Sequence, residues 1–143
     1  MARIQRDQKI SEIMTGDPVT VERDTPIAEV ARQMRDADTG AILVTDNGRL
    51  FGIATDRDIA VRAVADGLDP DTPADQVTTT DLRTLSPGDS VDDAIQTMRQ
   101  DDVRRLPIVD GNRPVGIVSL GDLAIERDED SVLADISSEP ANN

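Results

Sequence analysis

Two hydrophobic patterns alternate along the first half of the chain. Helical spacing, with apolar residues three or four positions apart, is found in Ile27, Val30, Ala31 and Met34. Short segments at 19–21, 41–44 and 50–54 are typical of strands, and Asn47-Gly48 between the last two predicts a tight hairpin. The order predicted is therefore strand, helix, strand, strand, helix, with Met34 in the core.

The ends of the two predicted helices are also marked. Thr25 is expected to be the N-cap of the first helix, with Pro26 in its first helical position. The second helix is expected to begin at Thr55 and to end at Gly67. Its inward-facing residues are predicted to be Ile59, Ala60, Ala63 and Val64.

The same unit occurs a second time. The segment Gly52–Asp58 returns as Gly116–Asp122, 64 positions later. Identical residues keep this offset in pairs such as Thr15/Thr79, Met34/Met98, Arg35/Arg99 and Asp46/Asp110. The chain is thus predicted to hold one unit at 9–67 and another at 73–125, joined by a linker at 68–72. Residues 1–8 are expected to be a flexible lead-in, and 126–143 an acidic run, a short helical turn and a frayed tail.

The fold class predicted is α/β, of the α+β kind. In each unit the helices are expected on one side of a small sheet, because a helical crossover joins its parallel strands. Such a half-covered sheet cannot bury its second apolar face alone. The two units are therefore expected to pack sheet to sheet about a pseudo-two-fold axis.

A hydroxyl followed three residues later by a carboxylate stands at the start of each second helix. Thr55 and Asp58 form the first pair, and Ser119 and Asp122 the second. This spacing is that of a capping box, in which both side chains satisfy backbone N–H groups of the first turn. A helix N-terminus also favours an anion. The spacing leaves both interpretations open.

Three features together resemble a known family. They are the doubled Gly-apolar-apolar-[Ser/Thr]-x-x-Asp segment, the apolar helical stripe before each copy, and Leu-Pro-Ile-Val-Asp-Gly at 106–111. The chain resembles a tandem pair of CBS domains, or Bateman module, over residues 9–125. It looks like a stand-alone two-CBS protein of the hypoxic-response type.

The resemblance implies two clefts that bind an adenine nucleotide. Asp58 and Asp122 would bind ribose hydroxyls, and Thr55 and Ser119 would lie near the phosphates. Segments 14–20 and 78–84, which include Thr20 and Thr84, would contact the adenine.

Three arginines are candidate phosphate ligands. Arg104 and Arg105 match a position that is often basic in the family, and each cleft is expected to borrow this position from the other unit. Arg104 and Arg105 would then lie at the Thr55/Asp58 cleft. The equivalent residues at the Ser119/Asp122 cleft, Gly40 and Ala41, carry no charge. Alternatively, the pair faces solvent, and Arg57 bonds either a phosphate or a neighbouring carboxylate.

The residue types argue against an enzyme. The chain has no His and no Cys, which removes the commonest general base, thiolate nucleophile and transition-metal ligands. The segment 36–40 lacks the glycine and glutamate positions of a calcium loop. No catalytic residue, no metal site and no required cofactor are predicted.

The charge limits the partners. A net charge of −14 argues against nucleic acid, whose binding depends on Lys and Arg. No apolar run reaches the length of a membrane span, and a cytoplasmic protein is expected. The excess of Asp and Arg fits either a high-salt environment or a GC-rich coding sequence.

Two functions remain. The first is a regulatory sensor that binds AMP, ADP or ATP and acts on an unidentified protein. The second is a ligand-free structural or interaction module, for example in a stress response. A homodimer is expected in either case, with Ala60, Ala63 and Val64 on the helix that would mediate it.

Overall fold

The structure, a computed structural model, describes residues 6–125 of the 143-residue chain. The start of the predicted lead-in at 1–5 lies outside the described residues. So do the predicted acidic run, helical turn and tail at 126–143. The described chain forms two compact bodies. The first body is residues 17–82 with 112–114, and the second is residues 6–16, 83–111 and 115–125.

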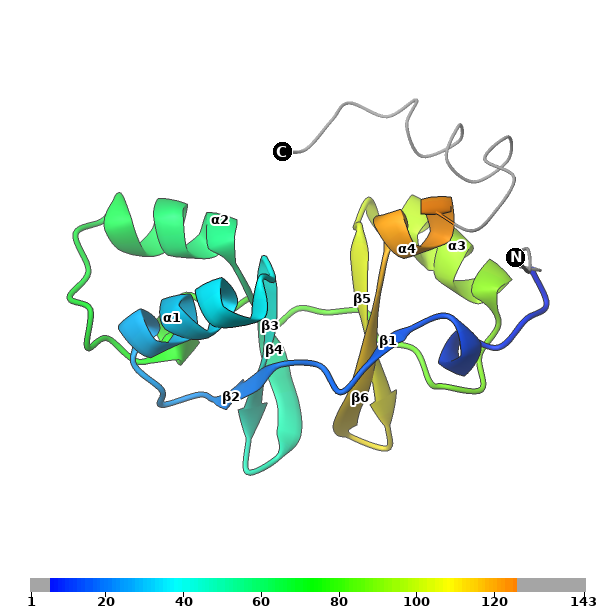
Figure 1. The fold of residues 1–143 in the computed structure, drawn as a ribbon, viewed down its shortest axis with the longest axis horizontal. Helices are drawn as coiled ribbons and strands as arrows, with labels where there is room; N and C mark the ends of the chain where they lie inside the picture. The colour runs from blue at the N-terminus through cyan, green and yellow to red at the C-terminus, as the bar shows by residue number, and fades with distance from the viewer. Residues whose placement is uncertain (1–5, 126–143) are drawn as a thin grey trace. The chain divides into compact units, whose positions relative to one another are not determined.

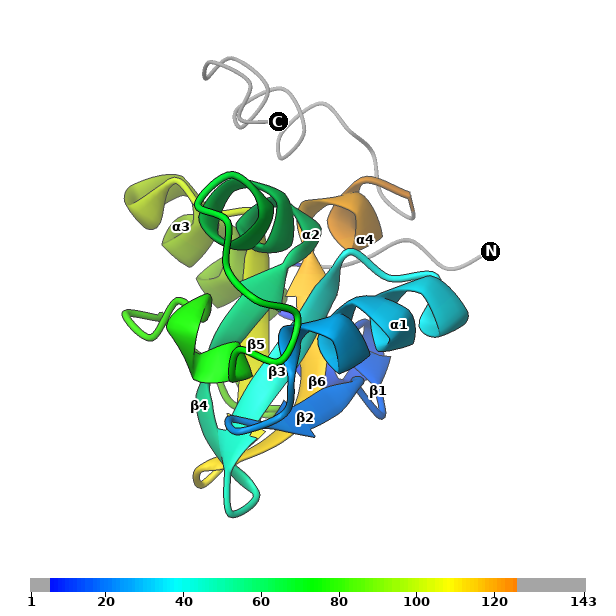
Figure 2. The same cartoon turned by 90° about the vertical axis from the view of Figure 1, so that its left-hand side faces the viewer.

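The first body contains a sheet in the order β2 (Thr20–Glu22), β3 (Ala41–Asp46), β4 (Arg49–Thr55). β2 is parallel to β3, and β3 is antiparallel to β4. The helices are α1 (Ile27–Ala37) and α2 (Asp56–Asp58), which continues as a π-helix over Ile59–Val64. Figure 2 shows α1 and α2 on the same side of this sheet. A 3-10 turn follows at Ala74–Gln76.

The second body repeats this arrangement. Its sheet has the order β1 (Thr15–Gly16), β6 (Arg113–Ser119), β5 (Arg105–Asp110). α3 (Val91–Asp101) and α4 (Leu120–Ile125) lie on one face of the sheet (Figure 1). A 3-10 turn at Ile10–Glu12 precedes β1. The α/β fold class and the repeated unit are confirmed, while the packing of the two units on each other stays a prediction.

Each body is completed by a segment that precedes the other copy in sequence. The N-terminal segment, residues 6–16, joins the second body, where Ile10 and Ser11 donate backbone hydrogen bonds to Asp89 and Pro87 (2.8 and 3.0 Å). β1 in this segment pairs antiparallel with β6, with Thr15 opposite Ile117. The N-terminal segment is thus part of a body whose remaining residues begin at 83.

The internal segment, residues 70–80, makes the equivalent contacts in the first body. Ala74 and Asp75 donate to the carbonyls of Thr25 and Arg23 (2.7 and 3.0 Å). Thr79 pairs antiparallel with Ile53 of β4, as Thr15 pairs with β6. The two bodies therefore have other boundaries than the predicted units 9–67 and 73–125. Those units describe the repeat in the sequence, and their boundaries stay a prediction.

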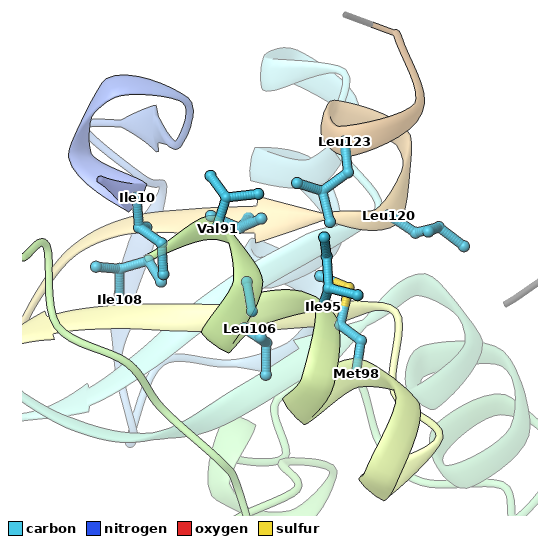
Figure 3. Close-up of a cluster of buried hydrophobic side chains, with 10 residues drawn as sticks. Ile10, Val91, Ile95, Met98, Leu106, Ile108, Leu120 and Leu123 are labelled. Atoms are coloured by element: carbon cyan, nitrogen blue, oxygen red, sulfur yellow. The ribbon is translucent and has the colours of Figure 1, made fainter. Parts of the chain in front are cut away.

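Both cores are aliphatic, as an almost aromatic-free composition requires. The second body buries one cluster, drawn in Figure 3: Ile10, Val91, Ala94, Ile95, Met98, Leu106, Ile108, Val118, Leu120 and Leu123. The first body's main cluster is Val21, Val30, Met34, Ile42, Val44, Ala54 and Ala74. The predicted place of Met34 in the core is confirmed.

The predicted start of α1 is wrong by one residue. Pro26 is the N-cap, and the cap makes no side-chain hydrogen bond. The N–H groups of Ile27 and Ala28 donate instead to the carbonyls of Thr72 and Pro70 in the internal segment (2.8 and 3.0 Å). Because a distant segment satisfies these donors, the Thr25 hydroxyl is not needed as a cap.

The inward face predicted for the second helix is also partly wrong. Ala63 is buried and Ile59 half-buried, but Ala60 is exposed and Val64 is 73% exposed. The π-winding explains the difference, since hydrogen bonds such as Ala65 N–H to Ala60 O span five residues. Residues spaced for a 3.6-residue turn then no longer share one face.

Candidate functional site

The helix start in the first body is a closed capping box. The Asp58 N–H donates to Thr55 Oγ1 (3.2 Å), and the Thr55 N–H donates to Asp58 Oδ2 (2.9 Å). The side chain of Asp58 is 17% exposed, and its Oδ1 lies 3.9 Å from Arg62 Nε. The carboxylate is therefore oriented by one backbone N–H of its own turn and by one guanidinium.

The second body has the same arrangement at the start of α4. The Ser119 N–H donates to Asp122 Oδ2 (2.9 Å), and the Asp122 N–H donates to Ser119 Oγ (3.1 Å). Both residues are half-buried. The sequence prediction of two equivalent hydroxyl–carboxylate pairs at helix starts is confirmed in its geometry. Their role toward a ligand stays a prediction.

The first-turn donors differ between the two starts. In the first body, Asp56 N–H donates to Gly40 O (2.9 Å), and Arg57 N–H donates to Asp56 Oδ1 (2.8 Å). With Asp58 N–H on Thr55, all three first-turn donors are occupied. The capping interpretation therefore accounts for all three donors in the first body, and binding of an anion at this helix start stays a prediction.

In the second body Leu120 stands in the position of Asp56, and Gly121 stands in the position of Arg57. Leu120 N–H donates to Arg104 O (2.8 Å), which matches the bond from Asp56 to Gly40. Gly121, however, follows a leucine, which has no side-chain acceptor to take its N–H. The second helix start thus has one fewer carboxylate and less intramolecular competition for an anion.

The glycines of the repeated motif have a structural role that the sequence interpretation missed. A Cβ on Gly52 would collide with Thr78 Cγ2 and with the backbone carbonyl of Thr79. A Cβ on Gly116 would collide with the Met14 sulfur and would lie 3.0 Å from Thr15 O. Glycine inside a strand often marks such close backbone approach, so its recurrence in both copies was the available signal.

The segments expected to contact adenine lie beside these glycines. Thr15 and Thr79 are the residues paired with the strands that lead to Ser119 and Thr55. Thr20 is exposed and begins β2 opposite Leu43, and Thr84 is exposed. In the part of the chain that the structure describes, no hydrogen bond links Thr20 or Thr84 to either capping box.

The arginine candidates are placed as follows. Arg104 and Arg105 are exposed and immediately precede or begin β5, in the same body as Ser119 and Asp122. Arg57 is exposed on α2. All three guanidiniums are therefore accessible to a solute, which fits either of the interpretations left open by the sequence.

Within residues 6–125, no cluster of three or more carboxylates that could hold a metal ion is found. Over the same range, no helix is both long and apolar enough to cross a membrane.

Comparison with known proteins shows the same repeat. The CBS domain family matches residues 10–64 and 74–129. The CBS domain-containing protein YhcV of Bacillus subtilis is 46% identical over 118 residues, which cover 82% of this chain and 84% of that protein. Hypoxic response protein 1 of Mycobacterium tuberculosis is 32% identical over 124 residues, covering 85% and 87%. Neither relative is named as an enzyme.

Solved structures agree. The structure of hypoxic response protein 1 with two coordinated zinc ions has a TM-score of 0.73 at 31% identity and covers 82% of this chain and 97% of that one. A CBS domain protein of Pyrobaculum aerophilum complexed with AMP has a TM-score of 0.76 at 29% identity and covers 92% and 100%. The chain belongs to the CBS-domain family and carries two CBS domains in tandem.

Proposed function

We propose that the protein is a non-catalytic regulatory module that binds an adenosine-containing nucleotide at the starts of α2 and α4. The observation that carries the proposal is the hydroxyl–carboxylate pair, repeated with the same hydrogen bonds at Thr55/Asp58 and Ser119/Asp122. Support comes from a relative of similar fold, which is complexed with AMP. AMP, ADP and ATP are the candidate ligands, and their occurrence in the cytoplasm fits a cytoplasmic protein.

The capping bonds leave acceptor capacity for a ribose. An ionised carboxylate has about four lone-pair positions, and the bond from Thr55 N–H uses one of them on Asp58. Two vicinal ribose hydroxyls can donate to the rest. Capping and ribose binding are therefore compatible, and the cap fixes the carboxylate before the ligand arrives.

The hydroxyl groups keep a donor for phosphate. Thr55 Oγ1 and Ser119 Oγ accept from the backbone, which leaves each O–H free to donate to a phosphate oxygen. The exposed Arg104 and Arg105 would add charge-assisted bonds to the phosphates of ADP or ATP, and Arg57 is a further candidate. Residues 14–20 and 78–84, with Thr20 and Thr84, would contact the base.

The second candidate is a ligand-free interaction module that acts as a homodimer. It is favoured by three exposed apolar side chains on or just after the second helix: Val61, Val64 and Leu68 are 50%, 73% and 37% exposed. A second copy would remove this surface from water. A homodimer is compatible with either function.

The test of nucleotide binding is calorimetry of the purified protein with AMP, ADP, ATP and adenosine, preceded by mass spectrometry for carried-over ligand. The variant Asp58→Asn/Asp122→Asn should lose binding, because a neutral amide accepts ribose hydroxyls less well. Asp66→Asn, an exposed change of the same type, is the matched control. No nucleotide binding by the native protein would leave the interaction module as the function.

The test of dimerisation is light scattering after gel filtration, across a range of salt concentrations. Val64→Asp should give a monomer, because a charge on the exposed face opposes burial. Arg35→Gln, on an exposed position of α1, changes the net charge by the same −1 and is the control for a change in charge alone. A native protein that is monomeric at micromolar concentration in every buffer would contradict the homodimer.

A further inference from the structure

The two segments that complete the bodies are joined to them differently. The internal segment, residues 70–80, belongs to the continuous stretch 17–82 that forms the first body. The N-terminal segment, residues 6–16, reaches the second body only through the whole of residues 17–82. A short stretch of chain therefore keeps the internal segment close to its body when it undocks. The N-terminal segment has no such short connection to the second body.

The side-chain anchors also differ. The internal segment is held by an ion pair between Arg23 Nε and Asp75 Oδ2 (3.2 Å), and the Arg23 guanidinium stacks on Phe51 at 4.0 Å. In the N-terminal segment the residue equivalent to Asp75 is Ser11, which is exposed. The main anchor there is Ile10, which is fully buried. The N-terminal segment also has an ion pair, between Arg6 Nη1 and Asp92 Oδ1 (3.1 Å), whose side chains are more exposed (45% and 34%) than those of Arg23 and Asp75 (40% and 21%).

The anchor and the candidate site share one strand and one core. β1 of the N-terminal segment pairs with Gly116 and Ile117, and β6 ends at Ser119. Ile10 belongs to the same buried cluster as Leu120, the first residue of α4 (Figure 3). Loss of the segment would remove the neighbour of β6 next to the capping box and open the core behind α4.

We propose that the N-terminal segment docks reversibly on the second body and that its docking controls the order of the Ser119–Asp122 helix start. A ligand at that start is then linked to the segment, a part of the inference that rests on the proposed function. A ligand that binds the docked form better must stabilise docking by the same factor by which docking strengthens its binding. The first body, with its continuous chain, lacks this control.

Hydrogen exchange tests the docking without any ligand. The amides of Ile10 and Ser11 should exchange roughly tenfold faster than those of Ala74 and Asp75, their equivalents in the first body, because the N-terminal segment opens more often. Equal or slower exchange at Ile10 and Ser11 would overturn the proposal.

The variant Ile10→Ala tests control of the helix start. It should speed exchange of the Leu120 and Asp122 amides at least about fivefold, the lower end of ordinary coupling between sites. Asp56 and Asp58, the equivalent amides in the first body, are the internal control. Ser11→Ala, an exposed change on the same segment, should have no effect. An unchanged rate at Asp122 in Ile10→Ala would overturn the proposal.

A disulfide lock gives the opposite change and covers the case in which Ile10→Ala does not fold. Thr15 and Ile117 are antiparallel partners, whose usual separation suits a disulfide, and the chain has no other Cys. Oxidised Thr15→Cys/Ile117→Cys should slow exchange at Ile10, Ser11 and Asp122 relative to its reduced form. Equal exchange in both forms, or a cross-link that forms only between chains, would overturn reversible docking.

AMP is the probe for the linked ligand. In an Asp58→Asn background, Ile10→Ala should weaken AMP binding at least about fivefold, and AMP should protect the amides of Ile10 and Ser11 by the same factor. AMP binding that is independent of Ile10 would overturn the linkage. If AMP binds neither site, the proposed function fails, and the segment's control of the helix start still stands or falls on the exchange results.

Discussion

The two bodies share one arrangement, but the outer strand is a paired strand in the first and a single bridge in the second. In the first body Leu43 N–H donates to Val19 O (3.0 Å), and β2 pairs over three residues. Pro107 takes the position of Leu43 in the second copy and has no N–H to donate. Only the bridge between Leu85 and Ile108 remains. Pro87 likewise takes the position of Arg23, whose N–H donates to Thr45 O (2.9 Å) in the first body, so two prolines account for the missing strand.

The hairpins differ in a similar way. Asn47 and Gly48 both have positive φ (53° and 83°), as in a type I′ turn. Of the equivalent residues Gly111 and Asn112, only Gly111 has a positive φ (69°), as in type II′. In the first body the Glu22 carboxylate also accepts from Asn47 N–H (2.8 Å). Serine replaces this glutamate in the second copy. The same strand connection is therefore built from different residues.

The helix starts complete the comparison. α3 has a side-chain capping box formed by Ser90 and Asp93, whereas α1 has no side-chain cap. Both starts nevertheless receive carbonyls from a docked segment, such as Gln8 O for Val91 N–H (2.8 Å) and Thr72 O for Ile27 N–H (2.8 Å). The lesson is that the docked segments are common to both bodies, while local caps and turns are free to vary.

The motif glycines should show the largest effect. Gly52→Ala places a Cβ against the backbone of Thr79, which cannot move away, whereas Gly116→Ala meets chiefly the flexible end of Met14. We expect Gly52→Ala to destabilise by about 3 kcal/mol and Gly116→Ala by about 1–2 kcal/mol, measured by urea unfolding. Gly88→Ala, where nothing lies near the added Cβ, is the control. Equal effects would refute the difference in close approach.

The next largest effect is expected on the affinity for ATP, when the two arginines at the start of β5 are removed. Arg104→Ala/Arg105→Ala should weaken ATP binding about tenfold or more, because charge-assisted bonds are worth roughly 1.5–3 kcal/mol each. Adenosine binding should not change, since it has no phosphate. Arg49→Ala/Arg113→Ala removes two exposed arginines, at the starts of β4 and β6, and is the charge control. An equal loss for ATP in the control would show a general field effect instead.

The caps should differ by about 1 kcal/mol. Ser90→Ala removes a hydroxyl that accepts from Asp93 N–H (3.1 Å) and should cost about 1 kcal/mol. Thr25→Ala should cost less than about 0.5 kcal/mol, because its hydroxyl caps nothing in α1. Thermal unfolding of both variants measures the difference. A cost at Thr25 as large as that at Ser90 would show that the two helix starts are equivalent.

The smallest effect is a dependence on pH. Hydrogen bonds from the Thr45 hydroxyl and the Asn47 N–H lower the pKa of Glu22 below its ordinary value. The stabilisation is therefore present above that ordinary value and is lost as the pH falls through the lowered pKa. Glu22→Gln should flatten the fall of melting temperature between neutral and acid pH, and the exposed Asp24→Asn should not.

What the sequence predicted was local or repeated. The stripe of Val30 and Met34, the Asn47-Gly48 turn and the spacing of Thr55 and Asp58 each lie within a few residues, and all three are found. The sequence did not predict that the N-terminal segment joins the second body and the internal segment the first. From the sequence alone, Thr15 could pair equally well with Ile53 or with its repeat Ile117. A repeated sequence does not say which copy a segment joins.

The role of the site residues was also beyond the sequence. A capping box and a ribose contact use the same hydroxyl and the same carboxylate, so Asp58 and Asp122 carry both interpretations at once. The phase of the second helix failed for another reason. π-winding after Asp58 is a tertiary outcome that no residue in 59–64 signals on its own.

The exchange of segments has a consequence for ancestry. A gene that encoded one copy would make a chain whose own leading segment fits the body of another molecule, so its folded form would be an exchanged dimer. Duplication and fusion would place both bodies in one chain and turn an encounter that depends on protein concentration into an intramolecular one. The two copies could then diverge in sequence, as at Leu43 and Pro107. Each body would still depend on the segment that precedes the other copy.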